Sequence, residues 1–98
     1  MLHLKFQATV IHWRGPAPFV FAPIPAEHVD AIRQAARHVT YGWGMIPVDV
    51  VIGGAGFITS LFPKDDTYLL PIKMAVRRKH GITVGDTIDI DMTIQPRR

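Results

Sequence analysis

Residue types that commonly carry out chemistry are sparse in this chain. It has no cysteine, so thiolate metal sites and disulfides are excluded. None of its histidines are spaced four residues apart on an expected helix, and no HExxH sequence occurs. These histidines are His3, His12, His28, His38 and His80. The sequence therefore indicates no metal site, and the histidines are expected to be scattered over the surface.

Three short motifs come near known catalytic patterns without completing them. Ser60 lies in ITSLF, which lacks the GxSxG pattern of a hydrolase nucleophile. The run Gly53-Gly54-Ala55-Gly56 lacks the lysine and hydroxyl of a P-loop and predicts a tight hairpin. Asp89 and Asp91 share one face of an expected strand, but they alternate with isoleucines as solvated positions do. We therefore expect a protein that is not an enzyme and that uses no cofactor.

One set of residues could form a binding site for a small ligand or a protein partner. Trp43 and Met45 lie in the glycine-rich segment GWGM, and Lys64, Lys73 and Arg77 would add positive charge. Ligand sites are usually built from apolar and aromatic side chains beside a few converging polar groups. Two other interpretations stay open, namely that Trp43 is a core residue closing a barrel mouth and that Lys73 is simply solvated.

A second set of basic residues suggests an alternative function in nucleic-acid binding. The net charge is +3, and much of the positive charge lies on one short expected helix and at the end of the chain. These residues are Lys73, Arg77, Arg78, Lys79, Arg97 and Arg98. Neutralising a phosphate backbone requires several such charges on one face. A solvated helix surface with a basic tail explains the same residues.

The elements that must position these residues are indicated by periodicity. Alternating or short apolar runs predict strands at 2–10, 19–22, 48–52, 57–62, 67–72 and 88–94. Helical spacing predicts one helix from Pro25 to near His38 and a shorter one from Lys73 to His80, ended by Gly81. A turn is expected at Pro63-Lys64-Asp65-Asp66. The prediction is a mainly β fold with two short helices.

The order of these elements repeats. Strand, strand, helix, strand occurs twice, and FVFAPIPAEHV in the first half matches TYLLPIKMAV in the second. We predict two ββαβ pseudo-repeats, at about 2–53 and 56–95, that form a small closed β-barrel. Because both halves lie in one chain, a monomer would be sufficient.

The motifs GWGMIPV, ITSLFPKDDTYLLPIK and AVRRKHGITVGDTIDIDM resemble the bacterial family DUF1905, a domain of unknown function. The resemblance covers roughly Phe6 to Ile94 and implies a double-split β-barrel made of two similar halves. The second half is also similar to the swapped-hairpin unit of the AbrB/MazE regulators, which bind DNA as dimers. Neither resemblance implies a reaction.

Composition sets the remaining limits. With 98 residues, the chain is expected to be a single domain spanning 1–98. A hydrophobic content of 48% with 19% charged residues is typical of a globular core. No apolar run approaches the ~20 residues that a membrane helix needs. We expect a cytoplasmic binding or accessory module with an unknown small ligand or protein partner and no membrane association.

Overall fold

The structure, a computed structural model, describes residues 2–13, 19–37 and 44–94. Within these ranges the chain forms seven strands and two helices. In chain order they are β1 Leu2–Thr9, β2 Ile11–Trp13, β3 Phe19–Pro23, α1 Ala26–Ala36, β4 Ile46–Ile52, β5 Ala55–Lys64, β6 Thr67–Pro71, α2 Met74–His80 and β7 Thr87–Ile94. Neither helix is long and apolar enough to cross a membrane.

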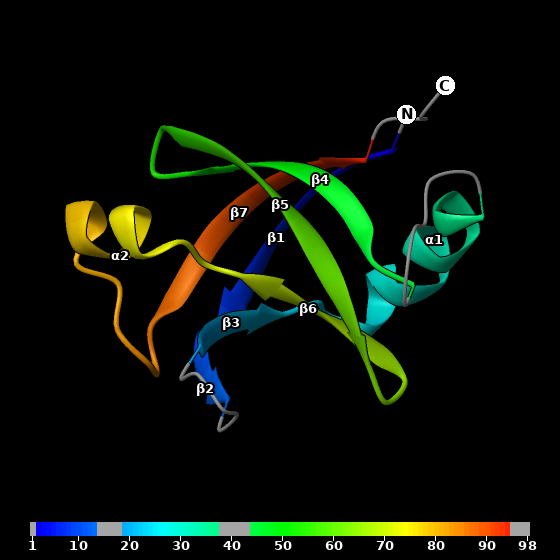
Figure 1. The fold of residues 1–98 in the computed structure, drawn as a ribbon, viewed down its shortest axis with the longest axis horizontal. Coiled ribbons are helices and arrows are strands. Elements are labelled where there is room, and N and C mark those ends of the chain that lie inside the picture. Colours follow the sequence, from blue (N-terminus) through cyan, green and yellow to red (C-terminus); the bar gives the residue numbers. More distant parts are fainter. Residues whose placement is uncertain (1, 14–18, 38–43, 95–98) are drawn as a thin grey trace.

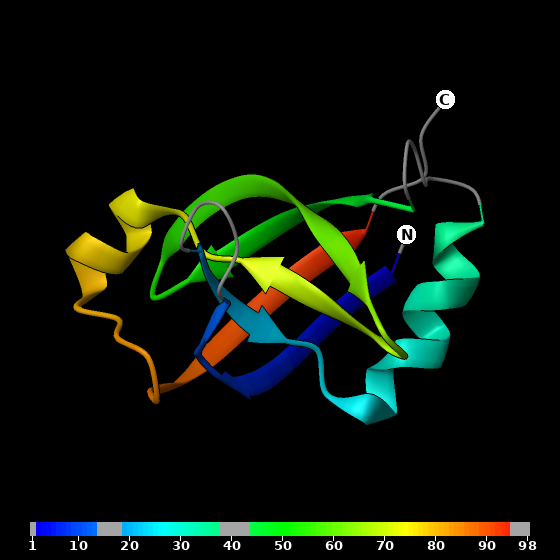
Figure 2. The same ribbon diagram turned by 60° about the horizontal axis from the view of Figure 1, so that its bottom comes forward.

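The strands form one antiparallel sheet in the order β1-β7-β4-β5-β6-β3-β2. The sheet is strongly curled into a half-barrel (Figure 1). Its two outermost strands, β1 and β2, follow each other directly in the chain. The helices lie at opposite ends of the sheet, α2 beside the β4–β5 turn and α1 beside the β5–β6 turn, as both views show (Figures 1 and 2).

Period-two alternation places the core on the inner face of this sheet. In β4 the buried positions are Ile46, Val48, Val50 and Ile52, and β7 contributes a matching set that ends at Ile94. Because successive strand side chains point to opposite faces, the residues between them form the outer face. The predicted inside and outside of β7 are thereby confirmed.

The β4–β5 hairpin confirms the turn predicted from the glycine run. Ile52 pairs with Ala55, so Gly53 and Gly54 form a two-residue turn. Their φ angles are 57° and 82°, and two positive values are what the favoured hairpin turns require. This turn fixes the register of β4 against β5 and hence the outer face of both strands.

Several predicted strand boundaries differ from the structure, and two of the differences have a clear physical cause. The turn expected at 63–66 contains only Asp65 and Asp66, because β5 continues through Lys64 and Pro63 pairs with Tyr68. The proline lies beyond Leu61, where the pairing of β5 with β4 ends. A proline, which lacks an N–H donor, is tolerated at such a ladder end.

The strand expected over 2–10 ends at Thr9, and the separate strand β2 was not predicted. The Val10 N–H donates to the Asp86 carbonyl at 2.8 Å, and the Gly85 N–H donates to the Val10 carbonyl at 2.8 Å. These bonds hold Val10 against the turn before β7, after which the chain leaves β7 and pairs with β3 as β2. Alternation alone could not predict this change of partner.

Both predicted helices are present. α1 begins after Pro25, which fits the preference of proline for helix starts, and buries Val29, Ile32 and Ala36. It ends at Ala36, and the predicted end near His38 lies outside the described residues. α2 begins after Lys73 and ends at His80, and the following Gly81, with a φ of 62°, forms the expected left-handed cap.

Of the predicted closed barrel with two pseudo-repeats, the structure confirms the mainly β class and the curled sheet. The chain is mainly β with two helices, and its antiparallel sheet is a strongly curled half-barrel. Closure of the barrel and duplication of its halves stay predictions.

Alanine at Gly53 is expected to destabilise the protein more than alanine at Gly54. A positive φ costs an L-residue roughly 1–2 kcal/mol at either position. A Cβ at Gly53 would lie 2.8 Å from His80 Nδ1, whereas a Cβ at Gly54 would meet no described atom within 4 Å. The exposed His80 ring must leave its rotamer to make room, so urea unfolding should show Gly53→Ala to be less stable than Gly54→Ala by about 0.5 kcal/mol.

The control is the same pair of substitutions in a His80→Ala background. Removing the ring removes the additional clash, so the two alanines should then cost the same free energy of unfolding. Equal costs in the wild-type background would contradict the packing of His80 against the turn.

Candidate functional site

Helix α2 concentrates positive charge at one end of the sheet. Its last turn carries Arg77, Arg78, Lys79 and His80, and its first turn carries no acidic residue. Cations in the last turn suit the helix dipole. Only one residue of this helix, Val76, is buried. Most of the helix surface is therefore exposed and basic.

Two contacts hold α2 in place. The Ile82 N–H donates to the Arg77 carbonyl at 3.0 Å, which closes the helix end, and both Ile82 and Val76 belong to the core cluster. At its last residue, the His80 ring lies against Gly53, where a side chain would clash. The helix is thereby fixed beside the β4–β5 turn.

Lys73, the residue preceding α2, lies beside the outer face of the β4–β5 hairpin. Together with that hairpin it lines a hollow of about 540 Å³. Its exposed or charged lining residues are Asp49, Val51, Gly56, Ile58 and Lys73. We call this surface the β4–β5 face. Phe57 also lines the hollow, where it packs against the core.

The β4–β5 face exposes aliphatic side chains. Ile58 is 66% exposed and Val51 is 43% exposed, and Met74, the first residue of α2, is 56% exposed. Farther along the outer side of β5, Phe62 is 42% exposed, and its ring lies 6.4 Å from that of Phe21. Adjacent exposed apolar residues are typical of interaction surfaces, whereas single ones need no explanation.

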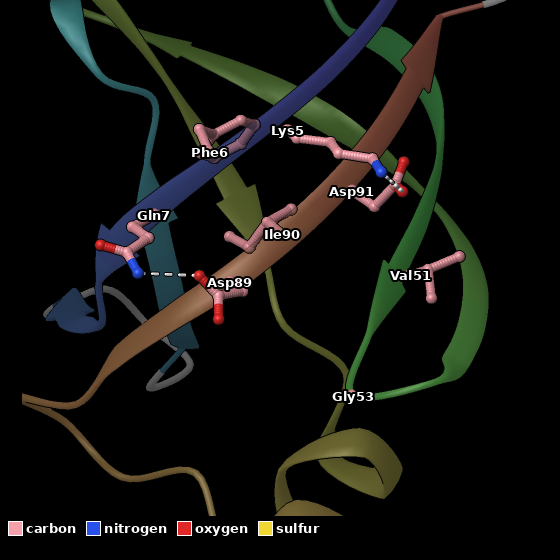
Figure 3. A pocket seen from close by; sticks show the side chains of 8 residues that line it. All are labelled: Lys5, Phe6, Gln7, Val51, Gly53, Asp89, Ile90 and Asp91. Carbon is pink, nitrogen blue, oxygen red and sulfur yellow. Dashed lines mark hydrogen bonds and ion pairs between the residues drawn. The ribbon is translucent and has the colours of Figure 1, made fainter.

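The outer face of β1 and β7 is polar instead (Figure 3). Gln7 donates to Asp89 at 2.9 Å, and Lys5 lies 4.0 Å from Asp91, which also contacts His3. Lys5, Gln7, Asp89 and Asp91 border a second hollow of about 470 Å³, which Val51 and Gly53 of the hairpin also line. Because its polar groups bond to one another across the two strands, they act as cross-strand pairs that stabilise the sheet.

The residues predicted for the ligand site separate into two groups. Lys73 and Arg77 lie at α2, by the Gly53 end of the hairpin. Met45 and Lys64 are partly buried at the other end, where Gly44 lies near Pro63. The eight residue steps from Met45 to Gly53 span about 26 Å of extended chain at ~3.3 Å each. Trp43 lies outside the described residues.

Four of the six residues predicted to bind nucleic acid lie close together in the structure. Lys73, Arg77, Arg78 and Lys79 share α2 and the residue before it. Arg97 and Arg98 lie outside the described residues. In the parts of the chain that the structure describes, no three histidine or acidic side chains are grouped to hold a metal ion.

The structure identifies Ile58 and Val51 as candidate binding residues that sequence reasoning missed. Both belong to runs in which apolar residues fall on the two faces of a strand, so periodicity alone cannot say which residue faces outward. The register supplies this information, because it sets Ile58 opposite Asp49 on the outer face. Pairing with the charged Asp49 is what indicates that Ile58 faces outward, and this pairing is known only from the structure.

Comparison with known proteins identifies one family. The model for the domain of unknown function DUF1905 matches residues 6–92. No curated protein is detectably similar to the chain.

Arg77→Met is expected to leave the protein as stable as the wild type or more stable. The Arg77 Nε is buried and has no hydrogen-bond partner in the described parts of the chain. An unsatisfied buried donor costs roughly 1–3 kcal/mol, and methionine keeps most of the apolar stem without this group. Chemical denaturation should therefore give an unchanged or higher free energy of unfolding.

The matched control is Arg78→Met, because Arg78 is exposed on the same helix. Its effect should stay within about 0.5 kcal/mol. A loss of more than about 1 kcal/mol for Arg77→Met alone would mean that the Nε–H is satisfied by a partner.

Proposed function

This chain belongs to the DUF1905 family of domains of unknown function, and we propose that it is a non-enzymatic module that binds a partner through the β4–β5 face. The module is a closed barrel of two related ββαβ halves, about 2–53 and 56–95. The β1–β7 ladder keeps a polar outer face, and the corresponding β4–β5 ladder has acquired an apolar binding surface. The observation that carries this proposal is the 66% exposure of Ile58 beside Lys73.

Matching hydrogen bonds support the relation between the halves. The Ile24 N–H donates to the Tyr68 carbonyl at 3.0 Å, and the Ile72 N–H donates to the Val20 carbonyl at 3.1 Å. Ile72 follows Ile24 by the same number of residues as Tyr68 follows Val20. The two bonds are therefore exchanged by the same two-fold relation, and the offset is the one that aligns the two proline-containing motifs.

The helix starts obey that same offset. The His28 N–H donates to the Pro25 carbonyl at 3.0 Å in the first half. In the second half the Val76 N–H donates to the Lys73 carbonyl at 3.0 Å. Lys73 thus occupies the position before its helix that Pro25 occupies before α1.

The long ladders correspond as well. The β4–β5 ladder ends with Ile52 opposite Ala55, and the β7–β1 ladder ends with Ile94 opposite Leu2. Counting inward from these ends, Ile46 to Ile52 correspond to Ile88 to Ile94. Val50 then corresponds to Met92, its own partner in the β4–β7 pairing. A two-fold relation between the halves requires such a self-matching pair.

This correspondence provides an internal comparison for Ile58. Lys5 opposite Asp91 is the fourth pair from the end of one ladder, and Ile58 opposite Asp49 is the fourth pair of the other. The fold accepts a lysine at this position, so packing does not require an apolar residue there. Burying an isoleucine gains about 1.5–3 kcal/mol, which a bound partner would realise.

The two-fold relation predicts that Val50 and Met92 can exchange side chains. Both are buried, at 1% and 0% exposure, and they are directly paired. Met92→Val should leave a cavity and Val50→Met should overpack the core, each costing about 1 kcal/mol or more. The double variant should regain most of this loss in free energy of unfolding, with a coupling of about 1 kcal/mol or more.

The control double variant is Val48→Met with Met92→Val, which makes the same change of composition at positions that do not correspond. Its two losses should add without recovery. If the Val50–Met92 exchange recovers no more stability than this control, the two-fold relation is wrong.

Ile58→Lys is expected to abolish partner binding while the protein stays folded. Lysine at this position mimics Lys5 in the other half, so the thermal midpoint should remain close to that of the wild type. Proteins captured from cell extract by the wild-type chain would be purified and titrated individually against both chains. At least one should lose affinity by about tenfold or more with Ile58→Lys.

Thr9→Lys is the matched control, since it adds the same charge to the polar outer face of the β1–β7 ladder, where Thr9 is exposed. It should bind like the wild type. The proposal fails if every captured protein binds the wild type, Thr9→Lys and Ile58→Lys with equal affinity.

A further inference from the structure

We infer that the partner of the β4–β5 face is an acidic polypeptide segment that also carries apolar side chains, an inference that rests on the proposed function. Aliphatic groups and cations adjoin on this surface. Ile58 and Val51 are exposed next to Lys73, and α2 extends from Lys73 with its basic last turn. A complementary ligand needs apolar side chains to contact Ile58 and Val51, and carboxylates to pair with Lys73 and the cations of α2.

The cations of α2 are available for such carboxylates. No ion pair joins Lys73, Arg78 or Lys79 to a carboxylate of the described residues. Asp49 adds one negative charge to the hollow that Lys73 lines. Asp89 and Asp91 line the neighbouring hollow with Val51, and Asp91 pairs with Val51, so the β7 side of the surface is acidic. The four lysine and arginine side chains of α2 and the residue before it place the positive charge at the α2 side.

The other helix provides an internal contrast. In α1, Arg33 lies 3.7 Å from Asp30, and His28 lies 3.9 Å from Glu27. The charges of α1 are thus offset by neighbours on the same helix, whereas α2 contains no acidic residue at all. An excess of one sign on α2 attracts a ligand of the opposite sign and speeds its association.

The aliphatic part of the surface favours a polypeptide over a nucleic acid. Single-stranded nucleic acids stack their bases on aromatic rings, and duplexes present phosphates to cations. The exposed groups beside Lys73 are those of Ile58, Val51 and Met74, while the ring of Phe57 packs against the core. Phosphate contacts would leave the aliphatic groups unused.

Charge also disfavours a second copy of this chain as the occupant. In a two-fold dimer the same patch contacts itself, so the lysines and arginines of both α2 helices would approach each other. Like charges brought together at an interface oppose association. An acidic segment neutralises the same residues instead.

The test is selection of peptides on the intact chain. A display library of random 15-residue peptides would be selected on the wild-type protein, and peptides that also bind Ile58→Lys would be removed. Enriched sequences should be negatively charged and should contain aliphatic or aromatic residues. Synthetic copies should bind about tenfold more weakly to Lys73→Glu and should weaken as salt rises, because ionic contacts are screened. Thr9→Lys should change their affinity less than about twofold.

The alternative outcomes are distinguishable. Neutral or basic peptides that depend on Ile58 would overturn this inference and leave the proposed binding face standing. A failure to enrich any Ile58-dependent peptide would contradict both. Binding of a 20-base-pair DNA duplex at ~50 mM salt that is lost in Lys73→Glu but kept in Ile58→Lys would overturn the inference in favour of nucleic acid. A wild-type dimer in sedimentation that Ile58→Lys dissociates would overturn it in favour of a second copy.

Discussion

The antiparallel pairing of β4 with β7 is the contact on which the rest of the fold depends. It spans three residue pairs centred on Val50 and Met92, and both central side chains are essentially inaccessible. Through this short pairing, the β4–β5 hairpin joins the β1–β7 pair in one sheet. Because period-two alternation is continuous across the pairing, fixing one inner face fixes the inner faces of the neighbouring strands as well.

The same constraint separates the residues that stabilise the fold from those that the proposed binding would use. The core occupies the inner face, so outer residues contribute little packing and can vary. On β1 and β7 the outer residues pair with one another, as Gln7 does with Asp89. On β4 and β5 they include Ile58 and Val51, which the sheet does not cover. A surface of this kind can change its ligand without changing the fold.

Much of the fold could be predicted from the sequence because its signals are local. Alternation identified the inner face of β7, and Gly53-Gly54 identified the hairpin turn. The break at Val10 could not be predicted, because it depends on hydrogen bonds to Gly85 and Asp86, which are distant in sequence. The continuation of β5 through Pro63 likewise depends on where its pairing with β4 ends.

The candidate site was predicted less well for a related reason. Lys73 and Arg77 were identified because basic residues are visible in a sequence, and α2 does bring them together. Met45 and Lys64 were grouped with them by residue type, but they lie at the far end of the hairpin. An exposed isoleucine is indistinguishable from a buried one until the register assigns its face. The charged residues of a mixed surface can therefore be predicted from a sequence, whereas its exposed apolar residues cannot. That difference explains why the basic residues alone suggest nucleic acid, whereas the polypeptide partner that we propose also takes account of the exposed aliphatic residues.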